Sequence, residues 1–532
     1  MKKLKLITTL SSLGMVAAAT PIVATSCTPD TTDTRNYAII AGEEVEFPEI
    51  VTQEDLQNLV PHNPRNAGAD AQVVIEIDGQ EYEFDKVSEV NLGTVHNVVE
   101  IPASFLSAEP LTGVSNLQKV SLSGIKDTFH IDESFLSKNY RLTSLKLPTM
   151  SSAVIANSDG STQYSQISDN FLKDCAGLKR VDFSPLANVG AITHGFLENC
   201  SNLQSADLSA LKSVRNIGNN FLAGCTSLSS VQLPTLKSEI EIYGLKGGCE
   251  IGNDFMYGVT KVTTVNFKPF AEARVIGNNF FSAAVLNLKT IDLSSWKMVN
   301  QIGDNFLTSE DIAPIIMIGM IESKTTTFKL PTFVPPAPFK SSTNADEPTL
   351  TIGDGFLAGF KYLTSVDLTP ISKVQTIGSG FMAGCENVES VDLSLLSKVQ
   401  KLGDSFLMYC KKIKTLDLSA MKALQSSTTE GIIGNEFLAG CNSLETVNMG
   451  DLPATAMATG SSNDQAFVQF LAEKQETYNG IDLIVSEANM SGWAAKITAD
   501  YPNIDGEPIP EEYAEYLGNG YFYRKVVAKQ VV

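Results

Sequence analysis

The sequence predicts a repeat solenoid, in which similar short units stack side by side and form a parallel β-sheet along one face. Two observations carry this prediction. The stretch IGNNFLAGCTSLSSVQL at residues 217–233 recurs in close copies, most often at intervals of 25 residues. The chain has 532 residues, of which 43% are hydrophobic and 19% charged, a composition typical of folded proteins. A stack of units reaches such a length without enlarging one core.

The first 26 residues have the pattern of a secretory signal. Three lysines precede an apolar run that ends near Val23, and small residues follow before Cys27. Pro21 and the small polar residues near the end of the run favour a cleaved signal over a membrane span. We therefore assign residues 1–26 to a signal peptide that is no part of the fold.

Cys27 follows directly after small residues in the sequence PIVATSC. This segment resembles the lipobox of lipoproteins from wall-less bacteria. The resemblance implies that the Cys27 thiol carries a lipid such as palmitate and that Cys27 becomes the first mature residue. Acyl chains, at about 0.8 kcal/mol per buried methylene, would hold the protein on the extracellular face of the cell membrane, with residues 27–36 as a polar tether. The alternative is a secreted protein in which Cys27 is an unpaired thiol.

One phenylalanine marks each copy of the repeat, whose pattern is approximately I-G-x-x-F-L-x-G-C-x-x-L-x-x-V-D-L-S. The marker phenylalanines are Phe105, Phe135, Phe171, Phe196, Phe221, Phe255, Phe280, Phe306, Phe356, Phe381, Phe406 and Phe437. A period between about 20 and 29 residues with spaced leucines is typical of a leucine-rich repeat solenoid. We expect about 12 to 13 rungs of roughly 25 residues over residues 87–450.

Each unit is expected to contribute one strand. In the copy at 217–233, Val231 and Leu233 alternate with polar residues, as in a strand with one buried and one solvated face. The corresponding strands are residues 87–92, 117–122, 142–147, 178–183, 203–208, 228–233, 262–267, 288–293, 325–330, 363–368, 388–393, 413–418 and 444–449. On the opposite side we expect a turn at Gly218 and an inward Phe221, because a unit buries its apolar face only against its neighbours.

This combination of Phe, Gly-Cys, a Leu three residues later and a V-x-L strand resembles the BspA-like class of bacterial surface leucine-rich repeats. The resemblance covers roughly residues 87–450. It implies the solenoid fold, and it suggests adhesion to host matrix or cell-surface proteins. The pattern departs from the class where SEDIAPIIMIGMIESK at residues 309–324 separates Phe306 from its strand, and where proline follows several strands.

The cysteines of the repeat are expected to be packing residues. Cys175, Cys200, Cys225, Cys385, Cys410 and Cys441 each follow a marker phenylalanine by four residues. Stacking would place them in a column in the crowded interior, where a small apolar side chain fits, and parallel side chains on neighbouring rungs suit disulfide geometry poorly. Cys249 lies outside this register, and we expect it to be the most exposed internal cysteine.

The two ends of the array are expected to be covered. Residues 37–86 contain two alternating runs around Asp78-Gly79, a hairpin signal, and we assign them to an N-terminal cap. Residues 451–532 contain helix-like stretches at 463–478 and 487–501 and strand-like stretches at 481–485 and 520–527. They form a small α+β C-terminal cap or, as the alternative, a separate binding domain.

Insertions interrupt the array near residues 151–166, 237–248, 308–349 and 425–432. The third contains the apolar stretch IAPIIMIGMI, which either contacts a partner or folds back over the core.

No catalytic motif, metal site or cofactor site is indicated. The four histidines are far apart in the sequence, and neither a G-x-S-x-G elbow nor a P-loop is present. The formal net charge of −21 disfavours nucleic acid as a partner. We therefore expect a protein that binds other proteins and not an enzyme.

An acidic, hydroxyl-rich strip on the strand face is the candidate binding site. Asp367, Asp392 and Asp417 come from consecutive units, and one ladder would place them about 4.8 Å apart. The candidate residues are Asp182, Asp207, Asp292, Asp367, Asp392, Asp417, Ser365, Ser390 and Thr415. They would receive a basic protein segment or a hydrated cation. The alternative is a solvated face that resists edge association.

The expected function is that of a lipid-anchored surface protein that adheres to host proteins. The alternative is a structural coat or scaffold protein that contacts other membrane proteins of the same cell.

Overall fold

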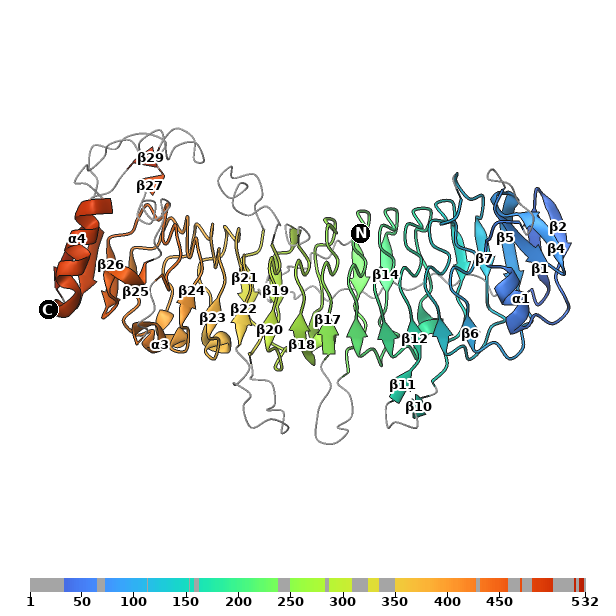
Figure 1. Cartoon of the computed structure of the whole chain (residues 1–532), viewed down its shortest axis with the longest axis horizontal. Helices are drawn as coiled ribbons and strands as arrows, with labels where there is room; N and C mark the ends of the chain where they lie inside the picture. Colours follow the sequence, from blue (N-terminus) through green and yellow to red (C-terminus); the bar gives the residue numbers. More distant parts are fainter. Residues whose placement is uncertain are drawn as a thin grey trace, which may run out of the picture.

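The computed structural model shows an elongated stack of rungs, with the first described strands (residues 36–92, blue) at one end and the helix of residues 490–500 (red) at the other (Figure 1). It describes residues 33–64, 72–111, 113–152, 154–156, 162–237, 249–282, 287–308, 324–333, 350–426, 431–457, 469–470, 481–500, 521–522 and 526–530. Cys27, most of the 308–349 insertion and most of residues 458–480 lie outside these ranges. Among the described residues, no helix has the length and apolar character that crossing a membrane requires.

One parallel sheet of eleven strands runs through the array in sequence order. Each strand ends at an isoleucine or leucine whose side chain is buried, and in seven of the eleven strands a glycine follows this residue. The strands are β6 (Glu100–Ile101), β8 (His130–Ile131), β12 (Gln166–Ile167), β13 (Ala191–Ile192), β15 (Asn216–Ile217), β17 (Cys249–Ile251), β18 (Ala273–Ile276), β20 (Gln301–Ile302), β22 (Thr351–Ile352), β23 (Thr376–Ile377) and β24 (Lys401–Leu402).

This sheet lies where the sequence predicted a turn. The V-x-L segments, predicted as the sheet, form only separate short ladders. Their strands are β5 (Val87–Leu92), β7 (Lys119–Ser121), β9 (Ser144–Lys146), β14 (Ser205–Asp207), β16 (Ser230–Gln232), β19 (Thr290–Asp292), β21 (Thr327–Lys329), β25 (Thr415–Asp417) and β26 (Thr446–Gly450).

The breaks in this second ladder have a local cause. The predicted strands at 178–183, 262–267, 363–368 and 388–393 do not form strands, and a 3-10 helix begins directly after the first three and at the last residue of the fourth. These helices are η2 (Ser184–Leu186), η3 (Lys268–Phe270), η5 (Thr369–Ile371) and η6 (Leu393–Leu396), and the first three contain a proline in their first turn. Proline fixes φ near the helical value, so the chain curls where a ladder would need it extended.

The marker phenylalanines form one buried column, as predicted. Each ring stacks on the next from Phe105 to Phe437, with centroid distances between 4.9 and 6.0 Å. Offset stacks at this separation are favourable beyond the area that they bury. Leucine or isoleucine side chains of the strands complete the same core.

The backbone around each marker phenylalanine alternates in and out of the left-handed region. In one rung, Asn220, Leu222 and Gly224 have φ values of 59°, 55° and 71°. The N–H groups of Asn220 and Gly224 donate to the next rung, and that of Leu222 donates to Phe196 on the preceding rung, each at 2.9 Å. A leucine at positive φ costs of order 1 kcal/mol, and these bonds between rungs offset that cost.

A ladder of side-chain acceptors follows the same corner, two residues before each marker phenylalanine. Each side chain accepts the backbone N–H of the equivalent residue on the next rung, at 2.6–3.0 Å. The acceptors of this acceptor ladder are the side chains of Asp169, His194, Asn219, Asn253, Asn278, Asp304 and Asp354. The last donor is the backbone N–H of Ser379.

The acceptor ladder explains the glycine of the I-G pair. A Cβ at Gly277 would lie 2.5 Å from Oδ1 of Asn253 and 2.6 Å from its backbone nitrogen. Gly218, which the sequence assigned to a turn, is instead constrained by the preceding rung, because its Cβ would lie 2.5 Å from the carbonyl carbon of Thr193. The glycine is required by close approach between rungs.

A larger repeat is superimposed on the rungs. Leu-Pro-Thr segments occur at residues 147–149, 233–235 and 330–332, three rungs apart. The residue after each segment donates its N–H to a proline carbonyl on the next rung: Met150 to Pro185, Leu236 to Pro269 and Phe333 to Pro370, at 2.9–3.0 Å. An insertion follows directly in all three cases, and the first contains the hairpin β10 (Val154–Ala156) and β11 (Thr162–Tyr164).

The N-terminal cap consists of β1 (Asn36–Ile40), β2 (Glu43–Glu46), α1 (Gln53–Asn58), β3 (Val74–Ile77), β4 (Gln80–Glu83) and η1 (Phe84–Lys86). The predicted hairpin is confirmed, because β3 pairs antiparallel with β4 around Asp78 and Gly79, both at positive φ. Strand β1 pairs antiparallel with β5 and so covers the first strand of the array.

At the other end, β28 (Ile481–Val485) and β30 (Val526–Gln530) extend the ladder beyond β26 in parallel. The predicted helix at 487–501 corresponds to η9 (Glu487–Asn489) and α4 (Met490–Asp500), and Trp493 Nε1 donates to the carbonyl of Leu452 at 2.8 Å. Within the predicted helix at 463–478, the two described residues form strand β27 (Gln469–Phe470), which pairs with β29 (Tyr521–Phe522). That helix prediction is wrong at these two residues, because antiparallel pairing with a distant segment overrides local propensity.

The remaining short elements are α3 (Lys422–Gln425) and η7 (Ala454–Ala456).

Replacing Phe221 with Ala should lower the free energy of unfolding by about 3–5 kcal/mol, because it leaves a cavity in the phenylalanine column. Urea denaturation followed by circular dichroism measures the change. As a control, Ser365→Ala removes an exposed hydroxyl and should change stability by less than about 0.5 kcal/mol. Equal effects of the two substitutions would contradict the column as the core.

Replacing Gly277 with Ala should destabilise the array by about 1–3 kcal/mol, because the new methyl group collides with Asn253. The matched control is Gly113→Ala, where no atom lies within 4 Å of the added Cβ. Thermal unfolding of the two variants compares them directly, and a Gly277→Ala protein as stable as the control would show that close approach does not select glycine.

Candidate interaction surface

The six predicted aspartates occupy equivalent positions in the V-x-L segments, on the face of the array that these segments form. We call Asp182, Asp207, Asp292, Asp367, Asp392 and Asp417 the Asp column. Asp292 is half-buried, and the other five are exposed. The sequence placed Asp367, Asp392 and Asp417 on adjacent strands of one ladder, but the structure places only Asp417 of these three in a strand. Their spacing is therefore set by stacked turns and not by a β-ladder.

Every member of the Asp column closes the turn that follows it. One carboxylate oxygen, Oδ1, accepts the backbone N–H of the residue two positions later, and the six distances are 2.9–3.0 Å. In three rungs a serine hydroxyl donates to the same oxygen, as Ser394 does to Asp392 at 2.5 Å. Aspartate followed two residues later by Ser or Thr is an Asx-turn signal that the sequence analysis did not use.

The second carboxylate oxygen differs along the column. Oδ2 of Asp292 pairs with Nζ of Lys329 on the adjacent strand at 2.9 Å. For Asp367, Asp392 and Asp417, the described part of the structure shows a hydrogen bond at Oδ1 alone. These three rungs therefore present exposed carboxylates whose orientation is fixed by the backbone.

Hydrogen bonds to the charged form lower the pKa of two of these groups. The Thr369 hydroxyl and N–H lower the pKa of Asp367. At Asp292, partial burial raises the pKa, but the Ser294 hydroxyl, Lys329 and the Ser294 N–H outweigh it and lower the pKa to about 2. Both carboxylates are ionised at neutral pH, as an acidic binding surface requires.

The predicted hydroxyl residues Ser365, Ser390 and Thr415 are exposed and precede Asp367, Asp392 and Asp417 by two residues. Thr415 lies with Asp417 in β25, which pairs in register with Thr446–Asn448 of β26. The predicted strip residues of three consecutive rungs are therefore exposed at equivalent positions, and ligand binding there stays a prediction.

The cysteines of the repeat are buried, as predicted, in two columns. Each Sγ donates to a backbone carbonyl of the preceding rung at 3.1–3.3 Å, for example Cys225 to Leu197. Where Asn139 replaces cysteine, its Nδ2 donates to the equivalent carbonyl, that of Leu106, at 2.8 Å. Cys249 is also buried, in β17, so the prediction of exposure is wrong; an insertion shifts its register without moving the strand outward.

Burial makes these thiols poor nucleophiles. It raises the pKa of Cys175, Cys225 and Cys385 to about 12, and that of Cys200 and Cys410 well above the ordinary value. The thiolate is the reactive form. Among the described residues, moreover, no group of three His, Cys, Asp or Glu side chains is placed to hold a metal ion.

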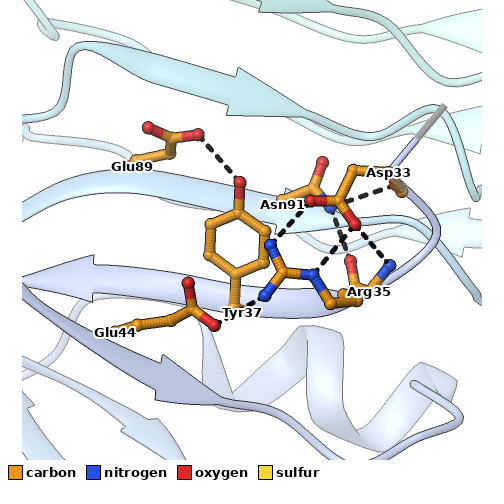
Figure 2. Close-up of polar contacts among 6 residues, drawn as sticks. All are labelled: Asp33, Arg35, Tyr37, Glu44, Glu89 and Asn91. Atoms are coloured by element: carbon orange, nitrogen blue, oxygen red, sulfur yellow. Dashed lines mark hydrogen bonds and ion pairs between the residues drawn. The ribbon is translucent and has the colours of Figure 1, made fainter. Parts of the chain in front are cut away.

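A charged network fixes the start of the N-terminal cap (Figure 2). Arg35 binds Asp33 at 2.9 Å and Glu44 of β2 at 2.8 Å, and its guanidinium lies 4.9 Å from the centre of the Tyr37 ring. The Tyr37 hydroxyl donates to Glu89 of β5 at 3.1 Å. Residues 33–36, which the sequence assigned to the tether, are therefore held against the cap.

A family model that describes the BspA type leucine rich repeat region matches the chain in six copies, over residues 150–251 and 339–456. These stretches are leucine-rich repeats. They include the rungs that carry the Asp column from Asp182 to Asp207 and from Asp367 to Asp417.

Several solved structures resemble the repeat array. A leucine rich cell surface protein from Faecalibacterium prausnitzii A2-165 is 17% identical, with 81% of this chain and 95% of that chain covered and a TM-score of 0.33. The pneumococcal vaccine antigen PcpA is 12% identical, with 86% and 88% covered and a TM-score of 0.30. The functional domain of InlJ from Listeria monocytogenes, which includes a cysteine ladder, is 12% identical, with 75% and 77% covered and a TM-score of 0.21. No curated protein matches the chain.

The depressed pKa of Asp292 predicts a specific pH dependence. A carboxylate whose pKa is lower in the folded state stabilises the fold above the ordinary aspartate pKa of about 3.9 and loses this contribution as pH falls towards 2. The stability difference between the wild type and Asp292→Asn should therefore be largest near neutral pH and shrink in acid. Asp182→Asn, which removes a carboxylate with no lysine partner among the described residues, serves as the control, and parallel pH profiles for both variants would contradict the assignment.

Proposed function

We propose that this protein is a lipid-anchored protein of the bacterial surface that binds other proteins, and that it acts as an adhesin for host matrix or cell-surface proteins. The repeat type supports the proposal, since the BspA-like class that the sequence resembles suggests adhesion. The solenoid offers a long, continuous surface, which suits a protein ligand better than a small molecule.

The observation that carries the proposal is the state of the carboxylates at Asp367, Asp392 and Asp417. One oxygen of each is fixed by the following turn, and the side chains are exposed. Fixed groups lose little conformational entropy when a ligand binds. A net charge of −21 attracts cationic ligands over distances limited by salt screening. The preferred ligand is therefore a basic, extended protein segment, and a hydrated cation is the simpler alternative.

The proposal includes binding without catalysis. The internal cysteines in the described part of the chain are buried, and burial keeps the five whose pKa is raised protonated at neutral pH. Backbone N–H groups donate to Oδ1 of the exposed aspartates. Because this oxygen already accepts a hydrogen bond, these carboxylates suit a docking surface better than proton transfer.

The proposal also includes an anchor at Cys27. Only five residues separate Cys27 from Asp33, where the charged network begins, so a lipid on Cys27 would hold the N-terminal cap within about 20 Å of the membrane. The array would then extend from an end that is fixed close to the lipid surface.

Replacing Asp367, Asp392 and Asp417 together with Asn should weaken binding to a basic ligand by at least about tenfold, since asparagine keeps the Oδ1 acceptor but removes the charge. The test is a screen of residues 33–532 against host matrix and cell-surface proteins at physiological salt, with and without calcium, followed by the affinity of the triple variant. Replacing Glu43, Glu46 and Glu49 with Gln on the N-terminal cap removes the same charge elsewhere and is the matched control.

Equal losses in the two triple variants would indicate long-range attraction alone and would reject the strip. Calcium-dependent binding that the Asn variant abolishes would favour the cation. If no host protein binds and the full-length protein co-purifies with membrane proteins of its own cell, the scaffold function replaces adhesion.

The anchor is tested separately. Metabolic labelling with palmitate should mark the wild-type protein, and Cys27→Ser should abolish the label and release the protein into the medium. The internal cysteines provide the control, because Cys225→Ala should leave both labelling and membrane association unchanged. Retention of the label in Cys27→Ser would show that lipidation occurs elsewhere.

A further inference from the structure

One member of the acceptor ladder is chemically different from the others. His194 donates its backbone N–H to Oδ1 of Asp169 at 3.0 Å and accepts the backbone N–H of Asn219 at ring atom Nδ1, at 2.8 Å. On the following rungs the acceptor is an oxygen of Asn or Asp, as in Asn253 N–H to Asn219 Oδ1 at 2.8 Å. The imidazole therefore replaces an amide or carboxylate in an otherwise regular hydrogen-bond pattern.

The hydrogen bond assigns the protonation state of the ring. A backbone N–H is a donor, so Nδ1 of His194 must carry a lone pair, and its proton must be on Nε2. An imidazolium has a proton on both nitrogens and cannot accept. Amide and aspartate oxygens remain acceptors over the mildly acidic range, so His194 is the one acceptor between Asp169 and Asp354 that acid converts into a donor.

Few charged groups near His194 could stabilise the positive charge of a protonated ring. The ring is exposed, and Asp169 on the preceding rung faces it with an oxygen that already accepts the His194 N–H. Glu198, four residues later, pairs with Lys173 at 3.1 Å. The next rung presents the uncharged Asn219. Protonation would thus place two N–H groups, those of Nδ1 and Asn219, against each other.

We propose that the contact between the rungs of Phe196 and Phe221 is a pH-sensitive joint, in which protonation of His194 opens the hydrogen bond to Asn219. The strand bond from Gly218 to Ile192 and the bond from Leu222 to Phe196, both 2.9 Å, hold the two rungs together at either side. Acid therefore loosens one corner of the stack and leaves the array folded. Since a solenoid is coupled through nearest neighbours, this joint changes the alignment of the rungs on its two sides.

The experiment is hydrogen exchange of the full folded chain, resolved to single amides, at about pH 8 and about pH 5, the range over which imidazoles ordinarily titrate. Exchange is expressed as protection factors, so that the intrinsic effect of pH on amide exchange cancels. The amide of Asn278, which donates to Oδ1 of Asn253 at 2.8 Å, is the internal reference. Protection of Asn219 relative to Asn278 should fall about tenfold or more between the two pH values.

The control variant is His194→Asn, which restores the residue type of the following rungs and should fold normally. In this variant the relative protection of Asn219 should be the same at both pH values. A wild-type ratio that does not change with pH overturns the proposal. So does a fall of equal size in His194→Asn, because it would trace the effect to another group. Nitrogen NMR of the His194 ring provides a second measurement: a proton on Nδ1 at pH 8 would contradict the assigned acceptor.

Discussion

Contact between neighbouring rungs is the constraint on which the rest of this structure depends. Rungs approach so closely that each side chain directed along the stack must either be absent or form a hydrogen bond with the neighbouring rung. Glycine meets the first condition, since a Cβ at Gly277 would collide with Asn253. The acceptor ladder meets the second, and the cysteine columns donate to the carbonyls of preceding rungs. The phenylalanine column then fills the space that these contacts define. Most of the repeat pattern follows from this single spacing.

The sequence predicted the features that repeat as side chains. The inward phenylalanines, the buried cysteines and the hairpin at Asp78-Gly79 could all be read from pattern and turn chemistry. The location of the continuous sheet could not. Most of its strands are two or three residues long, as at Asn216–Ile217, too short to show alternation. The longer V-x-L segments alternate clearly, but the turns that follow them, such as Thr369–Ile371, break their ladder.

The Asp column shows how one side chain serves both the fold and the surface. The sequence identified the aspartates as a surface feature but missed that Oδ1 closes a turn in each rung of the Asp column. A regular column of acids is therefore expected from folding requirements alone. Folding does not require that the second carboxylate oxygen, Oδ2, be exposed. At Asp292 this oxygen pairs with Lys329, which neutralises the charge of the carboxylate. The rungs of Asp367, Asp392 and Asp417 keep theirs open to solvent.

The Leu-Pro-Thr segments impose a longer period on the array. At each one the backbone N–H donates to a proline carbonyl on the next rung, as from Leu236 to Pro269, and an insertion follows in the sequence. After the second insertion, the first described residues form a strand of the continuous sheet, Cys249–Ile251. The described residues on either side of each insertion are thus bound within the array. Three rungs at about 4.8 Å each put successive exit points about 14 Å apart. Insertions of different sequence could therefore be exchanged at these points, while the spacing between the points would stay set by the stacked rungs.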